Sequence, residues 1–190
     1  MGGMPLRVFL RKGMGHTYML CLVTFQQENK PMTQHDIYYY DGKISPRVGK
    51  FIEAIAAARH HLSRAYDTRS ALECIVLSAS IIDAQLRIGI IMKQQLDNKT
   101  DSFDESLIHQ KGGDKKRQER DILKMALDHG VINDIVYHML NELYNKRNKC
   151  IHRYIISDIN YQYATRLVFE YDEAITLVIT QTDRFRMNRW

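Results

Sequence analysis

The chain has 190 residues, of which 45% are hydrophobic and 26% are charged. This length corresponds to one domain, or to one domain with a small extension, and the composition excludes a wholly disordered, collagen-like or membrane-spanning chain. The 27 Lys and Arg residues exceed the 22 Asp and Glu residues, and the net charge of +5 allows a polyanionic partner without requiring one.

The first 45 residues have the pattern of extended structure. Apolar residues alternate with others over 6–11, a glycine-containing turn follows at 13–15, and 17–25 and 36–40 are rich in strand-forming residues. We therefore expect a small β-meander over residues 1–45 and a helical domain over residues 46–190. Because two or three short strands are only marginally stable alone, the meander should pack against the helices.

From Ser45 onward the hydrophobic pattern changes to the period of helices. Ser45 followed by Pro46 is a typical helix start, and an apolar stripe behind it predicts a first long helix. Ser70 and Glu73 have the spacing of a capping box, which opens a second helix that extends to about Leu96. This second helix is apolar on nearly all of its faces, so we expect it at the centre of a bundle or in a dimer interface.

Three further helices are predicted in the remaining sequence. Residues 97–119 are polar and contain a Gly-Gly pair, which predicts a mobile loop, and a short helix over 118–129 then ends at Gly130. Apolar spacing predicts longer helices over 135–155 and 161–182. The predicted fold is therefore mainly α, an up-down bundle of four to five helices.

The apolar pattern of the helix predicted over 135–155 has one interruption. Apolar pairs recur every four residues from Ile135 to Tyr144, and one turn later the pattern places Arg147 and Asn148. Because a guanidinium keeps its charge in a protein, an arginine on a packing face needs a paired carboxylate, a water-filled cleft or an anionic ligand. Such breaks in a pattern are expected mainly at functional sites.

Other polar residues accompany Arg147 on this helix. His152 follows Asn148 by four residues, so the two side chains share a face, and Tyr154 shares the neighbouring face with Arg147. Three more basic residues surround these positions: Lys146, Lys149 and Arg153. This concentration of positive charge favours phosphate as a ligand and predicts that these residues contact the substrate.

Structural roles are open for the same residues. Asp83 is the lone carboxylate in the apolar second helix and is the expected partner that orients Arg147, or it pairs instead with Arg87 at i,i+4. Tyr154 lies on the apolar stripe, where packing is the simpler role.

The cysteine and histidine spacings give no sign of a metal site or a disulfide framework. The three cysteines are far apart, and no histidine pair has H-x3-H spacing. We therefore expect no metal and no cofactor, and a reduced, cytoplasmic setting without a membrane anchor.

The segment from Arg147 to Tyr154 spells R-N-K-C-I-H-R-Y. It resembles the signature of the HEPN superfamily, an arginine that is usually followed by a polar residue and then, after four to six positions, by a histidine. The tyrosine two residues beyond the histidine resembles the toxins of HEPN/MNT toxin-antitoxin pairs. Residues 45–185 are similar in layout to the HEPN bundle, whereas 1–45 and 97–119 are not part of that pattern.

The resemblance implies a metal-independent endoribonuclease, acting on RNA as a toxin or a phage-defence effector. His152 would be the general base on the ribose 2′-hydroxyl, Arg147 would stabilise the phosphorane, and cleavage would leave 2′,3′-cyclic phosphate ends. Asn148 would orient the phosphate or the facing chain. Tyr154 would line the cleft, and in the toxin branch it is also where a partner nucleotidyltransferase antitoxin attaches AMP.

The geometry of one helix supports a site that two chains share. Arg147 and His152 lie about 140° apart in azimuth and ~7.5 Å apart along the axis, so a two-fold mate would bring both pairs around one phosphate. We therefore expect a homodimer. Two other classes of function use the same residues: a non-catalytic helical module that binds RNA, nucleotide or a partner protein, and a structural dimer in which buried Arg147 specifies pairing.

Overall fold

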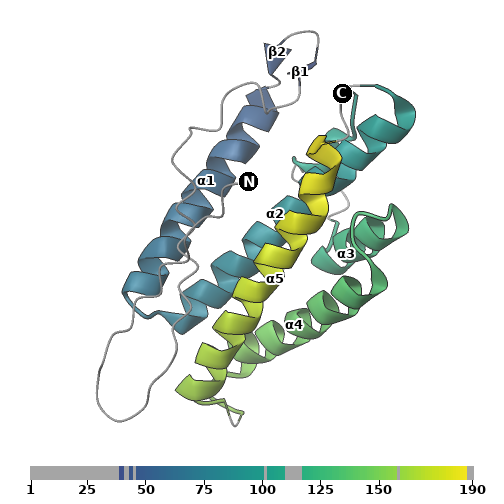
Figure 1. The fold of residues 1–190 in the computed structure, drawn as a ribbon. Helices are drawn as coiled ribbons and strands as arrows, with labels where there is room; N and C mark the ends of the chain where they lie inside the picture. Colours follow the sequence, from purple (N-terminus) through teal and green to yellow (C-terminus); the bar gives the residue numbers. More distant parts are fainter. Residues whose placement is uncertain are drawn as a thin grey trace, which may run out of the picture. The chain divides into compact units, whose positions relative to one another are not determined.

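The chain divides into two units between Asp36 and Ile37. The computed structural model describes residues 39–40, 43–44, 46–100, 102–109, 117–157 and 159–187, all of which belong to the second unit. This part of the chain is mainly helical (Figure 1), which confirms the helical bundle. The predicted β-meander falls largely on residues 1–38, outside the described residues.

The described elements follow the predicted order along the chain. The α-helices are α1 (Pro46–Asp67), α2 (Ala71–Asn98), α3 (Glu119–Asp128), α4 (Asp134–Arg153) and α5 (Tyr161–Met187). Ahead of α1, the two-residue strands β1 (Tyr39–Tyr40) and β2 (Lys43–Ile44) pair antiparallel. A 3-10 helix, η2 (Glu105–Leu107), lies between α2 and α3.

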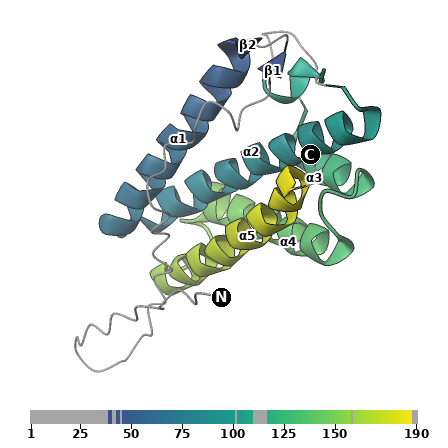
Figure 2. The same ribbon diagram turned by 45° about the horizontal axis from the view of Figure 1, so that its top comes forward.

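α2 is the central helix of the described unit. It contacts α1, α3, α4 and α5 (Figures 1 and 2), and 14 of its 28 residues are buried. Among the described helices, α2 is the one long and apolar enough to cross a membrane, but 72% of the relevant window is buried inside the protein. This burial confirms the expected position of α2 at the centre of the bundle.

α2 and α5 lie side by side and run in the same direction, whereas α1 and α4 run in the opposite direction (Figures 1 and 2). A buried hydrogen bond joins the central pair, since Gln85 Nε2 donates to Thr182 Oγ1 at 2.8 Å. The Thr182 hydroxyl in turn donates to backbone carbonyls of its own helix. The Gln85 amide nitrogen and the Thr182 hydroxyl are therefore satisfied within the core.

Two local predictions were wrong. The Ser70 side chain makes no capping hydrogen bond at the start of α2, and the capping box lies instead at the start of α3, between Gln118 and Asp121. The fourth predicted helix ends at Arg153, and Ile155 in the turn that follows is 95% exposed. A hydrophobic period alone does not show where a helix ends.

The segment predicted as a loop contains ordered contacts. Leu107 of η2 is buried, and its carbonyl accepts a hydrogen bond from Arg87 Nη1 at 2.8 Å. Arg117, which precedes α3, donates to Asp104 Oδ2 at 2.6 Å. The described part of this connection is therefore attached to α2 and to the start of α3.

The neighbouring elements come close to α2 at Gly89, where a Cβ atom would lie 2.6 Å from Val131 Cγ1 and 2.8 Å from Thr182 Cγ2. We expect Gly89→Ala to lower the free energy of unfolding by about 1 kcal/mol or more, because overpacking (about 1–3 kcal/mol) outweighs the gain in helix propensity. Gly49→Ala in α1 meets nothing within 4 Å and should raise the same quantity by up to about 1 kcal/mol. Urea denaturation of both variants tests this, and equal stabilisation would contradict the close approach.

Candidate phosphate-binding site on α4

The buried face of α4 includes an arginine. Val136, Leu140, Leu143 and Cys150 are buried at helical spacing, and Arg147 lies between the last two. The Arg147 side chain is 19% exposed, so a cation occupies the packing face, as the interrupted pattern predicted. A charge in this position requires a partner.

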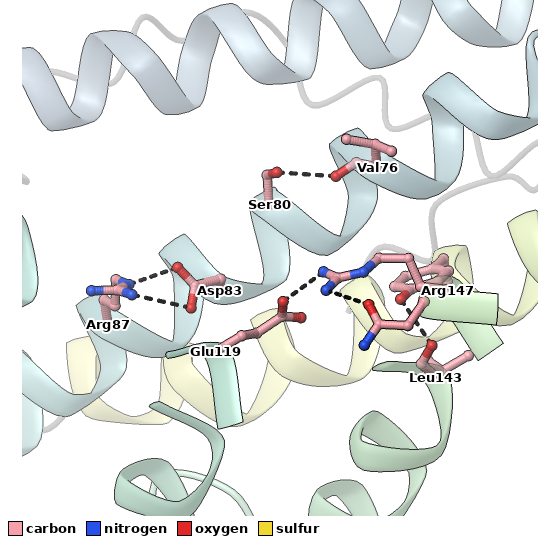
Figure 3. Close-up of polar contacts among 9 residues, drawn as sticks. Val76, Ser80, Asp83, Arg87, Glu119, Leu143 and Arg147 are labelled. Carbon is pink, nitrogen blue, oxygen red and sulfur yellow. Dashed lines mark hydrogen bonds and ion pairs between the residues drawn. The ribbon is translucent and has the colours of Figure 1, made fainter. Parts of the chain in front are cut away.

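Three neighbours hold the Arg147 guanidinium, and Figure 3 shows the ion pair with one of them, Glu119. Its Nη1 donates to Glu119 Oε2 of α3 at 2.5 Å, and its Nη2 donates to Asn148 Oδ1 at 3.1 Å. Its Cζ atom lies 4.8 Å from the ring centroid of Tyr144. A carboxylate, an amide and an aromatic ring therefore fix the orientation of the guanidinium.

Glu119, and not Asp83, is the carboxylate that pairs with Arg147. Asp83 accepts hydrogen bonds from Arg87, at 2.6 Å from Nε and at 3.4 Å from Nη2 (Figure 3). The i,i+4 alternative for Asp83 is thus the arrangement found. Sequence reasoning missed Glu119 because it is 28 residues from Arg147 and is one of two acidic residues in an ordinary first helical turn.

The two ion pairs form a half-buried cluster between α2, α3 and α4 (Figure 3). Burial raises the pKa of the Glu119 carboxyl above its ordinary value, and the nearby Asp83 carboxylate raises it further. Arg147 and Arg87 lower this pKa but do not cancel the increase. The ionised form of Glu119 is therefore less favourable in this cluster than in water, in spite of the direct ion pair.

Another side of α4 near its C-terminal end is open to solvent. A shallow depression there, which we call the α4 basic face, is lined by Asn145, Asn148, Lys149, His152 and Arg153. Lys149, His152 and Arg153 are exposed, and among the described residues no carboxylate forms an ion pair with them. Unneutralised cations beside an imidazole suit a phosphate ligand.

Asn148 connects the α4 basic face with the buried guanidinium. Its amide oxygen accepts a hydrogen bond from Arg147, and the same residue lines the α4 basic face with His152. Arg147 itself does not line that face. Within one chain, Asn148 therefore lies between Arg147 and His152, and these two side chains do not meet at one open surface.

Two residues predicted to contact substrate lie elsewhere. Lys146 forms ion pairs with Glu142 at 3.0 Å and with Glu170 of α5 at 2.7 Å. Tyr154 is the C-cap of α4 and packs, half-buried, against the core. Neither residue lines the α4 basic face.

Arg120 of α3 was not selected from the sequence but adjoins the α4 basic face. Its Nη2 donates to Asn145 Oδ1 at 2.6 Å, and its Cζ atom lies 4.8 Å from the ring centroid of Tyr144. Glu119 and Arg120, at the start of α3, thus both contact the C-terminal half of α4. No sequence pattern linked Arg120 to this helix, because the contact depends on how α3 packs.

Exposed apolar side chains follow the α4 basic face along the chain. They occupy the last turn of α4, the connection to α5 and the first residue of α5: Ile151, Ile155, Ile156 and Tyr161. Adjacent exposed apolar residues of this size are typical of contact surfaces.

In the described part of the chain, no group of three or more His, Cys, Asp or Glu side chains could hold a metal ion. Cys74 and Cys150 are free and buried, and burial raises the pKa of both thiols. Comparisons of the whole chain with protein-family models, with curated proteins and with solved structures find no match.

Proposed function

We propose that the chain is a metal-independent endoribonuclease of HEPN type, a toxin or phage-defence effector that cleaves RNA in the cytoplasm. The observation that carries this proposal is the α4 basic face, where the exposed His152 lies with Lys149 and Arg153, and where Asn148 also contacts Arg147. The helices would form an HEPN bundle, and residues 1–45 would add a β-meander to it.

In this proposal His152 removes the proton from a ribose 2′-hydroxyl. The 2′-oxygen attacks the adjacent phosphorus, the 5′-oxygen leaves with a proton, and the products are a 2′,3′-cyclic phosphate and a 5′-hydroxyl. Lys149 and Arg153 bind the RNA backbone, and Asn148 donates from its amide nitrogen to a phosphate oxygen. Arg147, which Asn148 contacts, stabilises the charge of the phosphorane.

The proposed assembly is a homodimer with RNA as its ligand. A second copy would cover the exposed side chains that follow the α4 basic face along the chain, Ile151, Ile155, Ile156 and Tyr161. The partner copy would bring a second set of the same residues to the phosphate. A nucleotidyltransferase antitoxin that modifies Tyr154 is a further proposed partner.

A second candidate is a non-catalytic module that binds RNA or nucleotide. The ion pair between Arg147 and Glu119 favours it, because a neutralised guanidinium is less available to a transition state. In this case the α4 basic face would bind the phosphates of RNA or nucleotide without cleaving RNA.

The deciding experiment incubates the purified full-length protein with total RNA in EDTA, beside Arg147→Ala and His152→Ala. Cleavage by the wild type that is lost in both variants supports the nuclease, and mass spectrometry of the new ends identifies the cyclic phosphate. Binding without cleavage supports the non-catalytic module. The absence of any effect on RNA contradicts both and leaves a structural role for Arg147.

A further inference from the structure

We infer that the Glu119 carboxylate occupies a phosphate subsite at Arg147, and that a phosphate of bound RNA replaces it there. The inference rests on the proposed interaction with RNA and adds to it a residue that sets the affinity. Glu119 thus competes with the substrate for the guanidinium, so that only a ligand with several phosphates opens the site.

The guanidinium is held in place by groups other than Glu119. Asn148 accepts a hydrogen bond from its Nη2, and the ring of Tyr144 lies against it. If Glu119 leaves, these two contacts keep the guanidinium oriented and its Nη1 donors become free. A phosphate oxygen makes the same charge-assisted hydrogen bond as a carboxylate oxygen, so it can take the place of Glu119 Oε2.

Glu119 can leave without unfolding its helix. α3 is anchored by the buried side chains of Ile122, Leu123 and Ala126 and by the capping box of Gln118 and Asp121. Glu119 is the first residue of α3, and its side chain is 25% exposed, so a rotation about its own side-chain bonds takes the carboxylate into solvent.

The electrostatics of the cluster weaken the retention of the Glu119 carboxylate. Burial and the Asp83 carboxylate raise the pKa of Glu119, so the ionised carboxylate is less favourable here than in water. Asp83 and burial would disfavour a phosphate at this position as well, but the rest of the bound RNA would contact Lys149 and Arg153 of the α4 basic face, which Glu119 does not. Asn148 belongs both to the Arg147 site and to the α4 basic face, so the two sites adjoin each other.

The test measures the affinity of the full-length protein for a short 2′-O-methyl RNA oligonucleotide, which cannot be cleaved, by fluorescence anisotropy at fixed salt. Glu119→Gln should bind about 10-fold more tightly than the wild type, since the oligonucleotide no longer has to displace a charge-assisted contact of Arg147. Glu119→Asp keeps the charge but shortens the reach, and it should give a smaller gain of the same sign.

The matched control is Glu105→Gln. Glu105 pairs with Arg47, so this variant makes the same change in net charge and also frees an arginine, but on α1 and η2. Its affinity should change less than about threefold, as expected for an exposed ion pair. Adding Arg147→Ala to Glu119→Gln should cancel the gain, because the two residues act on one contact.

A purely structural ion pair predicts a different result. In that case Glu119→Gln would lower the melting temperature and would bind the oligonucleotide no more tightly than Glu105→Gln does, which overturns the inference. Cleavage of unmodified RNA is measured separately on the same proteins. A gain in affinity without cleavage by any variant would contradict the nuclease and leave the phosphate subsite supported.

Discussion

Replacing His152 by alanine should lower the rate of RNA cleavage by about 10²–10⁴-fold, the usual contribution of a general base. The side chain is exposed, so its loss should leave the folded structure and the melting temperature nearly unchanged. The rate is measured on a labelled RNA in EDTA, and the affinity for the 2′-O-methyl oligonucleotide is measured in parallel. A large loss of rate with a small loss of affinity is the signature of a catalytic group.

The control for this variant lies on the same helix. His138 is exposed in the N-terminal half of α4, where its ring centroid is 5.4 Å from that of Tyr137, and it does not line the α4 basic face. His138→Ala should cleave RNA at the wild-type rate. Equal rates for His152→Ala and the wild type would remove the proposed base and, with it, the proposed mechanism.

The largest loss of stability is expected from truncating the central helix. Leu86 of α2 is 1% exposed, and Leu86→Ala should lower the free energy of unfolding by about 2–5 kcal/mol, from lost burial and from the cavity left behind. Leu177 of α5 is 43% exposed, and Leu177→Ala should cost less than about 1 kcal/mol. Urea denaturation of both variants provides the comparison.

Similar losses in these two variants would contradict the position of α2 at the centre of the bundle. A cavity is costly only where several elements pack around the same side chain. α2 contacts four other helices, so its side chains have few ways to rearrange around a missing group.

Much of the fold could be predicted because its helices are amphipathic or uniformly apolar over long stretches. The α-helical segments begin close to the expected residues, and the all-round apolar character of α2 correctly placed it at the centre. Features set by single hydrogen bonds were predicted less well. The S-x-x-E spacing at Ser70 is compatible with a capping box, but the bond itself depends on a side-chain rotamer that spacing does not determine.

The candidate site was predicted as far as one helix can define it. Residues three and four apart share a helix face, and this spacing brings together Asn148, Lys149, His152 and Arg153. Contacts with other helices could not be obtained in this way. Packing against α5 directs Lys146 toward Glu170.

The contact between Glu119 and Arg147 was likewise beyond a one-helix argument. The sequence shows that a buried guanidinium needs a partner, but it does not show which carboxylate the folded chain brings within reach.

The hydrogen bond between Gln85 and Thr182 limits how the central helices can move. If α5 slid along α2 by one turn, the Gln85 amide would lose its acceptor in a region that water does not reach, at a cost of about 1–3 kcal/mol. The hydrogen bond therefore fixes the axial position of α5 relative to α2. Rearrangements that accompany ligand binding should then occur in the peripheral α3, at the side chains of its first turn, while the α2–α5 pair stays rigid.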